Sequence, residues 1–184
     1  MGTVKGFLAY LALATLIAGV SVFGLQKADA TQISQRLKVP QLSGDVFFNA
    51  KEAPRIALGE VTLLHYWTFA CGNCQANLPA YDRIFKEFEP KGLKVVGVHT
   101  PELEFERKVE NVEKAIRKHD IKWPVLIDDK GLNWNRWRLE YWPTVFLIDR
   151  KGEVKFKWEG ELAWQGRDGE EQLTQMIQKL LAEK

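Results

Sequence analysis

The stretch "VTLLHYWTFACGNC", residues 61–74, decides how this chain folds. Residues 61–69 form a run of apolar, aromatic and β-branched side chains, which is typical of a strand buried on both faces of a sheet. The run passes directly into Cys71 and Cys74, the only two cysteines among 184 residues. The question that the sequence raises is what two thiols are for at this spacing and in this place.

The residues after the cysteines have the pattern of a helix. Apolar side chains recur three and four positions apart, and Pro90 with Gly92 ends the pattern; the side chains are Leu78, Tyr81, Ile84, Phe85 and Phe88. Pro79 falls inside this segment, so we expect a kink there. Cys71 should therefore lie in the first turn of a helix that directly follows a buried strand.

The rest of the chain alternates between strand and helix patterns. The patterns predict a short strand at Val46–Phe48, strands at 93–100 and 123–128, a charged amphipathic helix at 105–120, a turn and short helix at 131–139, a hairpin that turns at Lys151–Gly152, and a last helix from about Asp168. This order predicts an α/β domain with a partly parallel sheet, helices on both faces and one antiparallel edge.

The first thirty residues differ from the rest. Lys5 precedes an uninterrupted apolar run at 7–25, and Ala28 and Ala30 stand at −3 and −1 of a cut after residue 30. This is the pattern of an export signal, although the run also has the length that crosses a bilayer. We assign 1–30 to a signal peptide or signal anchor, and 31–184 to one extracytoplasmic domain, either soluble or tethered to the membrane by the apolar segment.

Composition excludes several functions. The net charge is +2 and the sequence has no Lys/Arg cluster, so we expect no nucleic-acid partner. A zinc or copper site needs more ligands than two thiols, and only three histidines could supplement them. We therefore expect no metal and no cofactor other than a redox-active Cys71–Cys74 disulfide. As a structural bridge this disulfide would stabilise little, because it closes a very short loop.

The helix start gives the two thiols different roles. A free thiol has a pKa of about 8.5, and the positive end of a helix dipole lowers it by up to about one unit. Cys71 should therefore be the nucleophile, and Cys74, one turn further on, should resolve its mixed disulfides. Thr68, three residues before Cys71, leaves a thiol peroxidase as an alternative, and a non-catalytic module that binds a metal or a partner is another.

The motifs resemble those of thioredoxins. The cysteines with Trp67 resemble the "W-x-x-x-C-x-x-C" stretch of that family, and Pro79 matches the kink proline of its active-site helix. "YWPTVFLID" (141–149) resembles the strand that follows a cis-proline. The resemblance implies a cis Trp142–Pro143 bond facing the disulfide, with Pro143 shaping a substrate groove walled by Trp67 and Trp142.

A segment at about 93–140, inserted before this proline, resembles the exported branch related to TlpA and ResA. It is most similar to the thioredoxin-like domain of DipZ-type proteins, which carry "C-x-N-C", "GVHTPE" (97–102 here) and "YWP" (141–143 here). The resemblance covers roughly 38–180. It implies a thioredoxin-like central mixed sheet, and a protein-disulfide oxidoreductase that reduces protein disulfides and is recharged by a membrane electron donor, with a general oxidant or isomerase as the alternative.

Three positions leave the site's details open. His65 stands where thioredoxins hold a buried Asp, and is either a proton relay for Cys74 or a packed strand histidine. Asn77 stands where ResA-like proteins place a Glu, so their pH-sensitive behaviour does not transfer. His99 should end a strand at the same edge of the sheet as the disulfide, either lining the site or serving as a plain turn residue.

Overall fold

The computed structural model describes residues 38–183. The signal or anchor predicted at 1–30 lies outside the described residues. None of the helices between 38 and 183 combines the length and the apolarity that crossing a membrane requires.

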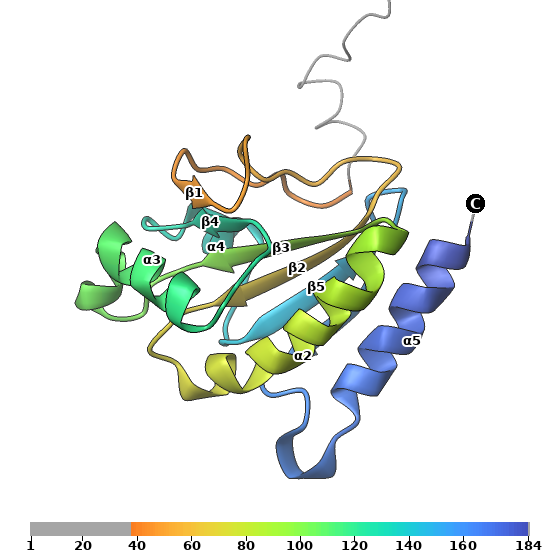
Figure 1. Cartoon of the computed structure of the whole chain (residues 1–184). Coiled ribbons are helices and arrows are strands. Elements are labelled where there is room, and N and C mark those ends of the chain that lie inside the picture. The colour runs from red at the N-terminus through yellow and green to blue at the C-terminus, as the bar shows by residue number, and fades with distance from the viewer. Residues whose placement is uncertain (1–37, 184) are drawn as a thin grey trace, which may run out of the picture.

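A six-stranded mixed sheet forms the centre of the molecule, with the strand order β1-β4-β3-β2-β5-β6 (Figure 1). The strands are β1 Phe47–Phe48, β2 Val61–Trp67, β3 Leu93–His99, β4 Val125–Ile127, β5 Thr144–Ile148 and β6 Val154–Glu159. The three strands β2, β3 and β4 are parallel, as the sequence predicts. The prediction of one antiparallel edge was wrong: β5 and β6 form one, and β1 pairs antiparallel with β4 at the other.

Helices cover both faces of the sheet, which confirms the predicted fold class. They are α2 Gly72–Phe88, α3 Val109–Lys118, α4 Leu132–Arg136 and α5 Gly169–Ala182, with short 3-10 turns η1 Glu89–Lys91, η2 Glu104–Arg107 and η3 Trp164–Gly166. α2, α3 and α5 pack on one face around the larger core. α4 and apolar residues between 39 and 58 cover the other (Figure 1).

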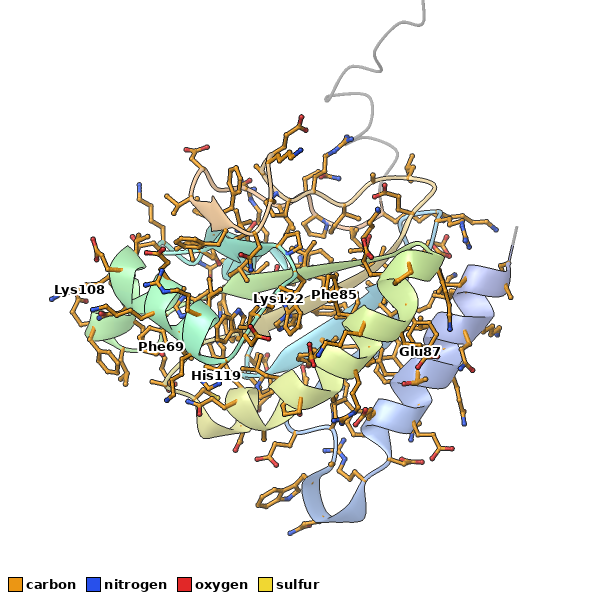
Figure 2. The ribbon with its side chains drawn as sticks, in the orientation of Figure 1. Phe69, Phe85, Glu87, Lys108, His119 and Lys122 are labelled. Carbon is orange, nitrogen blue, oxygen red and sulfur yellow. The ribbon has the colours of Figure 1, made fainter. Side chains whose placement is uncertain are left out.

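The helix predicted at 105–120 is divided in two. Lys108 has an extended backbone (φ −72°, ψ 114°) and separates η2 from α3. Its side chain projects away from the sheet (Figure 2). The cause is Glu106, which is fully buried and accepts hydrogen bonds from the N–H groups of Glu102 and Leu103. These bonds fix η2 as a separate turn, and the apolar face of α3 begins only at Val109.

The arrangement brings the predicted site residues to one edge of the sheet. β2 and β3 are parallel and end together, with Trp67 paired to His99. α2 begins five residues after β2, at the same edge. The cysteines therefore lie where the carboxyl ends of parallel strands meet the start of a helix, a common position for a site in an open α/β sheet.

Candidate active site

Cys71 is the N-cap residue of α2, one position before the predicted first turn. Its backbone is extended (φ −79°, ψ 114°), and its Sγ accepts a hydrogen bond from the N–H of Cys74 at 3.3 Å. Cys71 is half-buried, whereas Cys74 is buried in the core beneath it, and both thiols are free. The Cys71 sulfur is therefore accessible, whereas the Cys74 sulfur is buried below it.

The two thiols have opposite acid–base behaviour. A hydrogen bond from the Cys74 thiol is the main cause that lowers the pKa of Cys71 to about 7, helped by backbone N–H groups of Cys74 and Asn73. Burial raises the pKa of Cys74. The hydrogen bond to Cys71 raises it further, because Cys74 must keep its proton in order to donate that bond. At neutral pH about half of Cys71 is ionised while Cys74 stays protonated. These pKa directions are compatible with the predicted roles of Cys71 as nucleophile and Cys74 as resolving thiol, which remain predictions.

A buried carboxylate that sequence reasoning missed lies behind the cysteines. Oε1 of Glu106 accepts hydrogen bonds from the Thr68 hydroxyl and from the Ala70 N–H, the latter at 2.8 Å. Burial alone would raise the pKa of Glu106, but these bonds and those from the N–H groups of Glu102 and Leu103, just before η2, lower it. The sequence signal that could have located Glu106 is its place three residues after Leu103, where a short helical turn starts, which is the spacing of a capping box.

His99 ends β3, as predicted, and its side chain is buried. Its Nε2 lies 3.3 Å from the Thr68 hydroxyl, and the Phe69 ring stacks on it at 5.5 Å between centroids. Burial lowers the pKa of His99 to about 4, so the ring is neutral. Phe69, which is labelled in Figure 2, is partly exposed, whereas the His99 ring on which it stacks is buried.

His65 lies fully buried on β2. Its Nε2 accepts a hydrogen bond from Trp123 Nε1 at 2.8 Å, which leaves the proton of the neutral ring on Nδ1. Burial lowers the pKa of His65 to about 3. The centroid of the His65 ring also lies 4.5 Å from the centroid of the Tyr81 ring. These are the contacts of a packed strand histidine, and none of the described hydrogen bonds joins His65 to Cys74.

The Trp142–Pro143 peptide bond is cis, as the resemblance implied. Trp142 is half-buried and stacks on Trp134 with ring centroids 3.8 Å apart, next to an exposed Tyr141. Trp67 was expected in the groove wall, but the structure places it beneath the site. Its ring is fully buried and meets His99 edge-on, because β2 is covered on both faces.

Asn77 connects the cysteine helix to the cis-proline. Its Oδ1 accepts a hydrogen bond from the Leu162 N–H at 2.9 Å, and its Nδ2 donates to the Gly160 carbonyl at 3.1 Å. The Gly160 N–H in turn donates to the Pro143 carbonyl at 2.8 Å. The loop after β6 is therefore fixed beside the cysteines, where a hollow of about 180 Å³ reaches Asn73 and Trp164.

Between residues 38 and 183, no three histidine, cysteine, aspartate or glutamate side chains gather in a group that could hold a metal ion.

The chain matches the model of the AhpC/TSA family over residues 37–157. It is 37% identical to the DipZ proteins of Mycobacterium tuberculosis and Mycobacterium bovis over 97 residues, which are 53% of this chain and 14% of DipZ. The thiol-disulfide oxidoreductase YkuV of Bacillus subtilis is 25% identical over 150 residues, 80% of this chain and 97% of YkuV.

The solved structure of a thioredoxin-like protein in its oxidised form superimposes with a TM-score of 0.67 at 23% identity, covering 80% of this chain and 96% of that protein. This likeness establishes the thioredoxin-like fold. The chain spans about a seventh of the length of the DipZ proteins that it matches.

Proposed function

The chain belongs to the AhpC/TSA family and has the thioredoxin-like fold, and from this premise we propose that it is a thiol–disulfide oxidoreductase acting through Cys71 and Cys74. The observation that carries the proposal is the pairing of an accessible Cys71, whose pKa is lowered to about 7, with a protonated Cys74 one helical turn away. The relatives DipZ and YkuV support it.

The reaction proceeds in two exchanges. The Cys71 thiolate attacks one sulfur of a substrate disulfide, forming a mixed disulfide and releasing the other substrate sulfur as a thiolate that takes up a proton. Cys74 then loses its proton and attacks Cys71. The mixed disulfide breaks, the second substrate thiol leaves, and the Cys71–Cys74 disulfide forms. Two electrons and two protons pass from the protein's dithiol to the substrate.

We expect the substrates to be protein disulfides. The backbone beside cis-Pro143 and the half-buried Trp142 offer an extended substrate chain a surface to pair with, and the exposed Gly72 and Asn73 leave Cys71 open to it. Turnover as a reductant requires a donor of two electrons that regenerates the dithiol. An exported location makes a membrane electron carrier the expected donor.

The location outside the cytoplasm rests on the first thirty residues. Their basic start, apolar run and small residues before position 31 support export by a signal, either cleaved or retained as a tether.

The test of the proposal is reduction of insulin disulfides by dithiothreitol with catalytic amounts of protein. The wild type should accelerate the reaction, and Cys71→Ser should return it to the uncatalysed rate. Cys74→Ser should instead trap substrates as mixed disulfides on Cys71, because no resolving thiol remains. Equal rates for the wild type and Cys71→Ser would refute the proposal and would favour a thioredoxin-like binding module without turnover.

The same variants test the thiol peroxidase alternative. A peroxidase consumes peroxide in a first turnover that survives Cys74→Ser. In the structure the Thr68 hydroxyl, which suggested that alternative, is engaged by Glu106 and His99. We therefore expect the first-turnover peroxide consumption of Cys74→Ser to be slow compared with its trapping of protein disulfides.

A further inference from the structure

Two tryptophan rings are stacked at the edge of the sheet where the cysteines lie. Trp134 comes from α4 and Trp142 directly precedes cis-Pro143; their ring centroids are 3.8 Å apart and their planes are inclined by 22°. Because Thr144, the first residue of β5, pairs with Tyr66 near the end of β2, Trp142 lies at the end of the sheet where α2 begins. The stack joins the two cores, since Trp142 packs against the larger core and Trp134 against the smaller one.

Hydrogen bonds from the sheet hold Trp134 in place. Its backbone N–H donates to the buried carboxylate of Asp128 at 2.9 Å, and the N–H of Asn133 donates to the same carboxylate at 3.0 Å. The Thr100 hydroxyl also donates to Asp128, at 3.1 Å, and the Thr100 N–H donates to the carbonyl of Trp67 at 3.0 Å. A continuous set of hydrogen bonds therefore leads from the end of β2 to the start of α4 and fixes the backbone that carries the Trp134 ring.

Trp142 has fewer contacts that could fix its ring. Among the described aromatic pairs, Trp134 is the only ring that meets it. Its indole Nε1 is buried and has no hydrogen-bond partner among the described residues. On one side of it Tyr141 is exposed, and on the other side Pro143 has no N–H to donate. The stack with Trp134 is therefore the contact that fixes the plane of the Trp142 ring.

We propose that Trp134 is a positioning residue for protein substrates: its ring holds the Trp142 ring in the orientation that a substrate chain meets beside cis-Pro143. The inference rests on the proposed function, since it concerns how the same site receives its substrate. It gives α4 a role in the site, although α4 lies on the face of the sheet opposite α2 (Figure 1). Trp134, rather than the buried Trp67, is then the second tryptophan of the groove wall.

The proposal predicts different effects on large and small substrates. A substrate chain that lies along the groove contacts Trp142, and a ring that is ordered before binding loses no freedom when the chain binds. A small disulfide reaches the Cys71 sulfur without lying along the groove. The contact that acts on this sulfur comes from the N–H of Cys74 on α2, which the stack does not include. Loss of the Trp134 ring should therefore weaken the reaction with chains and spare the reaction with small disulfides.

The experiment measures single-turnover oxidation of the reduced protein by two disulfides, insulin and bis(2-hydroxyethyl) disulfide, each below saturation. Trp134→Ala should lower the second-order rate constant with insulin by about 2- to 12-fold, the effect of having to order one large side chain on binding. Its rate constant with the small disulfide should stay within about 2-fold of the wild type, because only binding of the chain is changed.

Two further variants separate positioning from a general effect on α4. Trp134→Phe keeps a ring that can stack, so it should restore most of the insulin rate constant. Leu132→Ala removes an exposed side chain from the same helix and should leave both rate constants within about 2-fold of the wild type. Two indoles this close also give an exciton couplet in the circular dichroism spectrum, which Trp134→Ala and Trp142→Ala should each remove. A wild type without this couplet would overturn the inference.

The outcomes distinguish this inference from the proposed function. A wild type that reduces neither disulfide would overturn both. An active wild type whose Trp134→Ala variant loses both rate constants equally, or loses neither, would overturn only the inference, as would a Trp134→Phe variant as slow with insulin as Trp134→Ala. If Trp134→Ala does not fold, Trp134→Leu fills the space without a ring and should show the same selective loss with insulin.

Discussion

At the scale of single residues, the site works because one side-chain type is placed in two environments. Cys71 lies at the surface with its sulfur receiving N–H and S–H hydrogen bonds, and Cys74 lies in the core. Hydrogen bonds to a charged acceptor are stronger than those to a neutral one, so they favour the thiolate of Cys71. Burial penalises a thiolate at Cys74.

The first prediction concerns the titration of Cys71. Cys74→Ala removes the thiol donor, so the pKa of Cys71 should rise from about 7 by about one unit or more, since a hydrogen bond to a charged group contributes ~1.5–3 kcal/mol. The rate of alkylation by iodoacetamide between pH 5 and 10 measures this. Cys74→Ser keeps a donor and should stay closer to the wild type. Identical midpoints for Cys74→Ala and the wild type would contradict the assignment of the hydrogen bond.

At this scale the sequence predicted what depends on local pattern and missed what depends on tertiary position. The cysteine spacing and the proline of "YWP" could be interpreted directly, and the cis bond is confirmed. The depth of Trp67 and the burial of Glu106 could not, because an aromatic ring or a carboxylate has the same sequence signal inside and outside the core. Only the packing of η2 against the residues before Cys71 buries Glu106.

At the scale of elements, α2 depends on Asn77 for its connection to the loop after β6. Asn77→Ala would leave the N–H of Leu162 and the carbonyl of Gly160 without these partners, which should lower the free energy of unfolding by about 1–3 kcal/mol. Urea unfolding measures the loss, and faster hydrogen exchange at the Leu162 amide localises it. Ala76→Ser, an exposed change on the same helix, should cost less than about 0.5 kcal/mol. Unchanged protection of the Leu162 amide from hydrogen exchange would contradict this role of Asn77.

The contact between β2 and β3 gives a second prediction at this scale. A Cβ at Gly97 would lie 2.9 Å from Nε2 of His65 and 3.3 Å from Nε1 of Trp123. Gly97→Ala should therefore lower the free energy of unfolding by about 1–3 kcal/mol, the cost of overpacking a core. At Gly72 an added Cβ meets nothing within 4 Å, so Gly72→Ala should leave stability equal or slightly higher in the same assay. A neutral Gly97→Ala would show that the histidine can move.

Strong periodicity made most elements predictable. The strands at 61–67 and 93–99, α2 and α5 follow the predicted ranges closely, because long apolar patterns determine them. The helix expected at 105–120 was interrupted because the buried Glu106 requires a turn that the charged sequence does not reveal. The partner of β1 was not predictable, since two residues carry too little pattern to select a neighbouring strand.

At the scale of the whole molecule, location is the property that remains a prediction from sequence. If the domain is exported, a membrane-impermeant maleimide should label Cys71 on intact cells that express the full chain. Cys74 is buried, so Cys71→Ser should abolish the labelling. Labelling that appears only after lysis would contradict export. The mass of the purified protein would then distinguish a product beginning at residue 31 from a retained anchor.

The two edge strands of the sheet affect how readily the protein aggregates at high concentration. An open edge strand is a template on which strands of other molecules can add and build fibres. Here β1 offers only two residues for such growth, and β6 presents the exposed lysines Lys155 and Lys157 along its length. An incoming strand would have to accommodate both ammonium groups. A protein that begins at residue 31 should therefore stay monodisperse at high concentration, which light scattering can follow, and it should seed no amyloid even while its thiols are cycling.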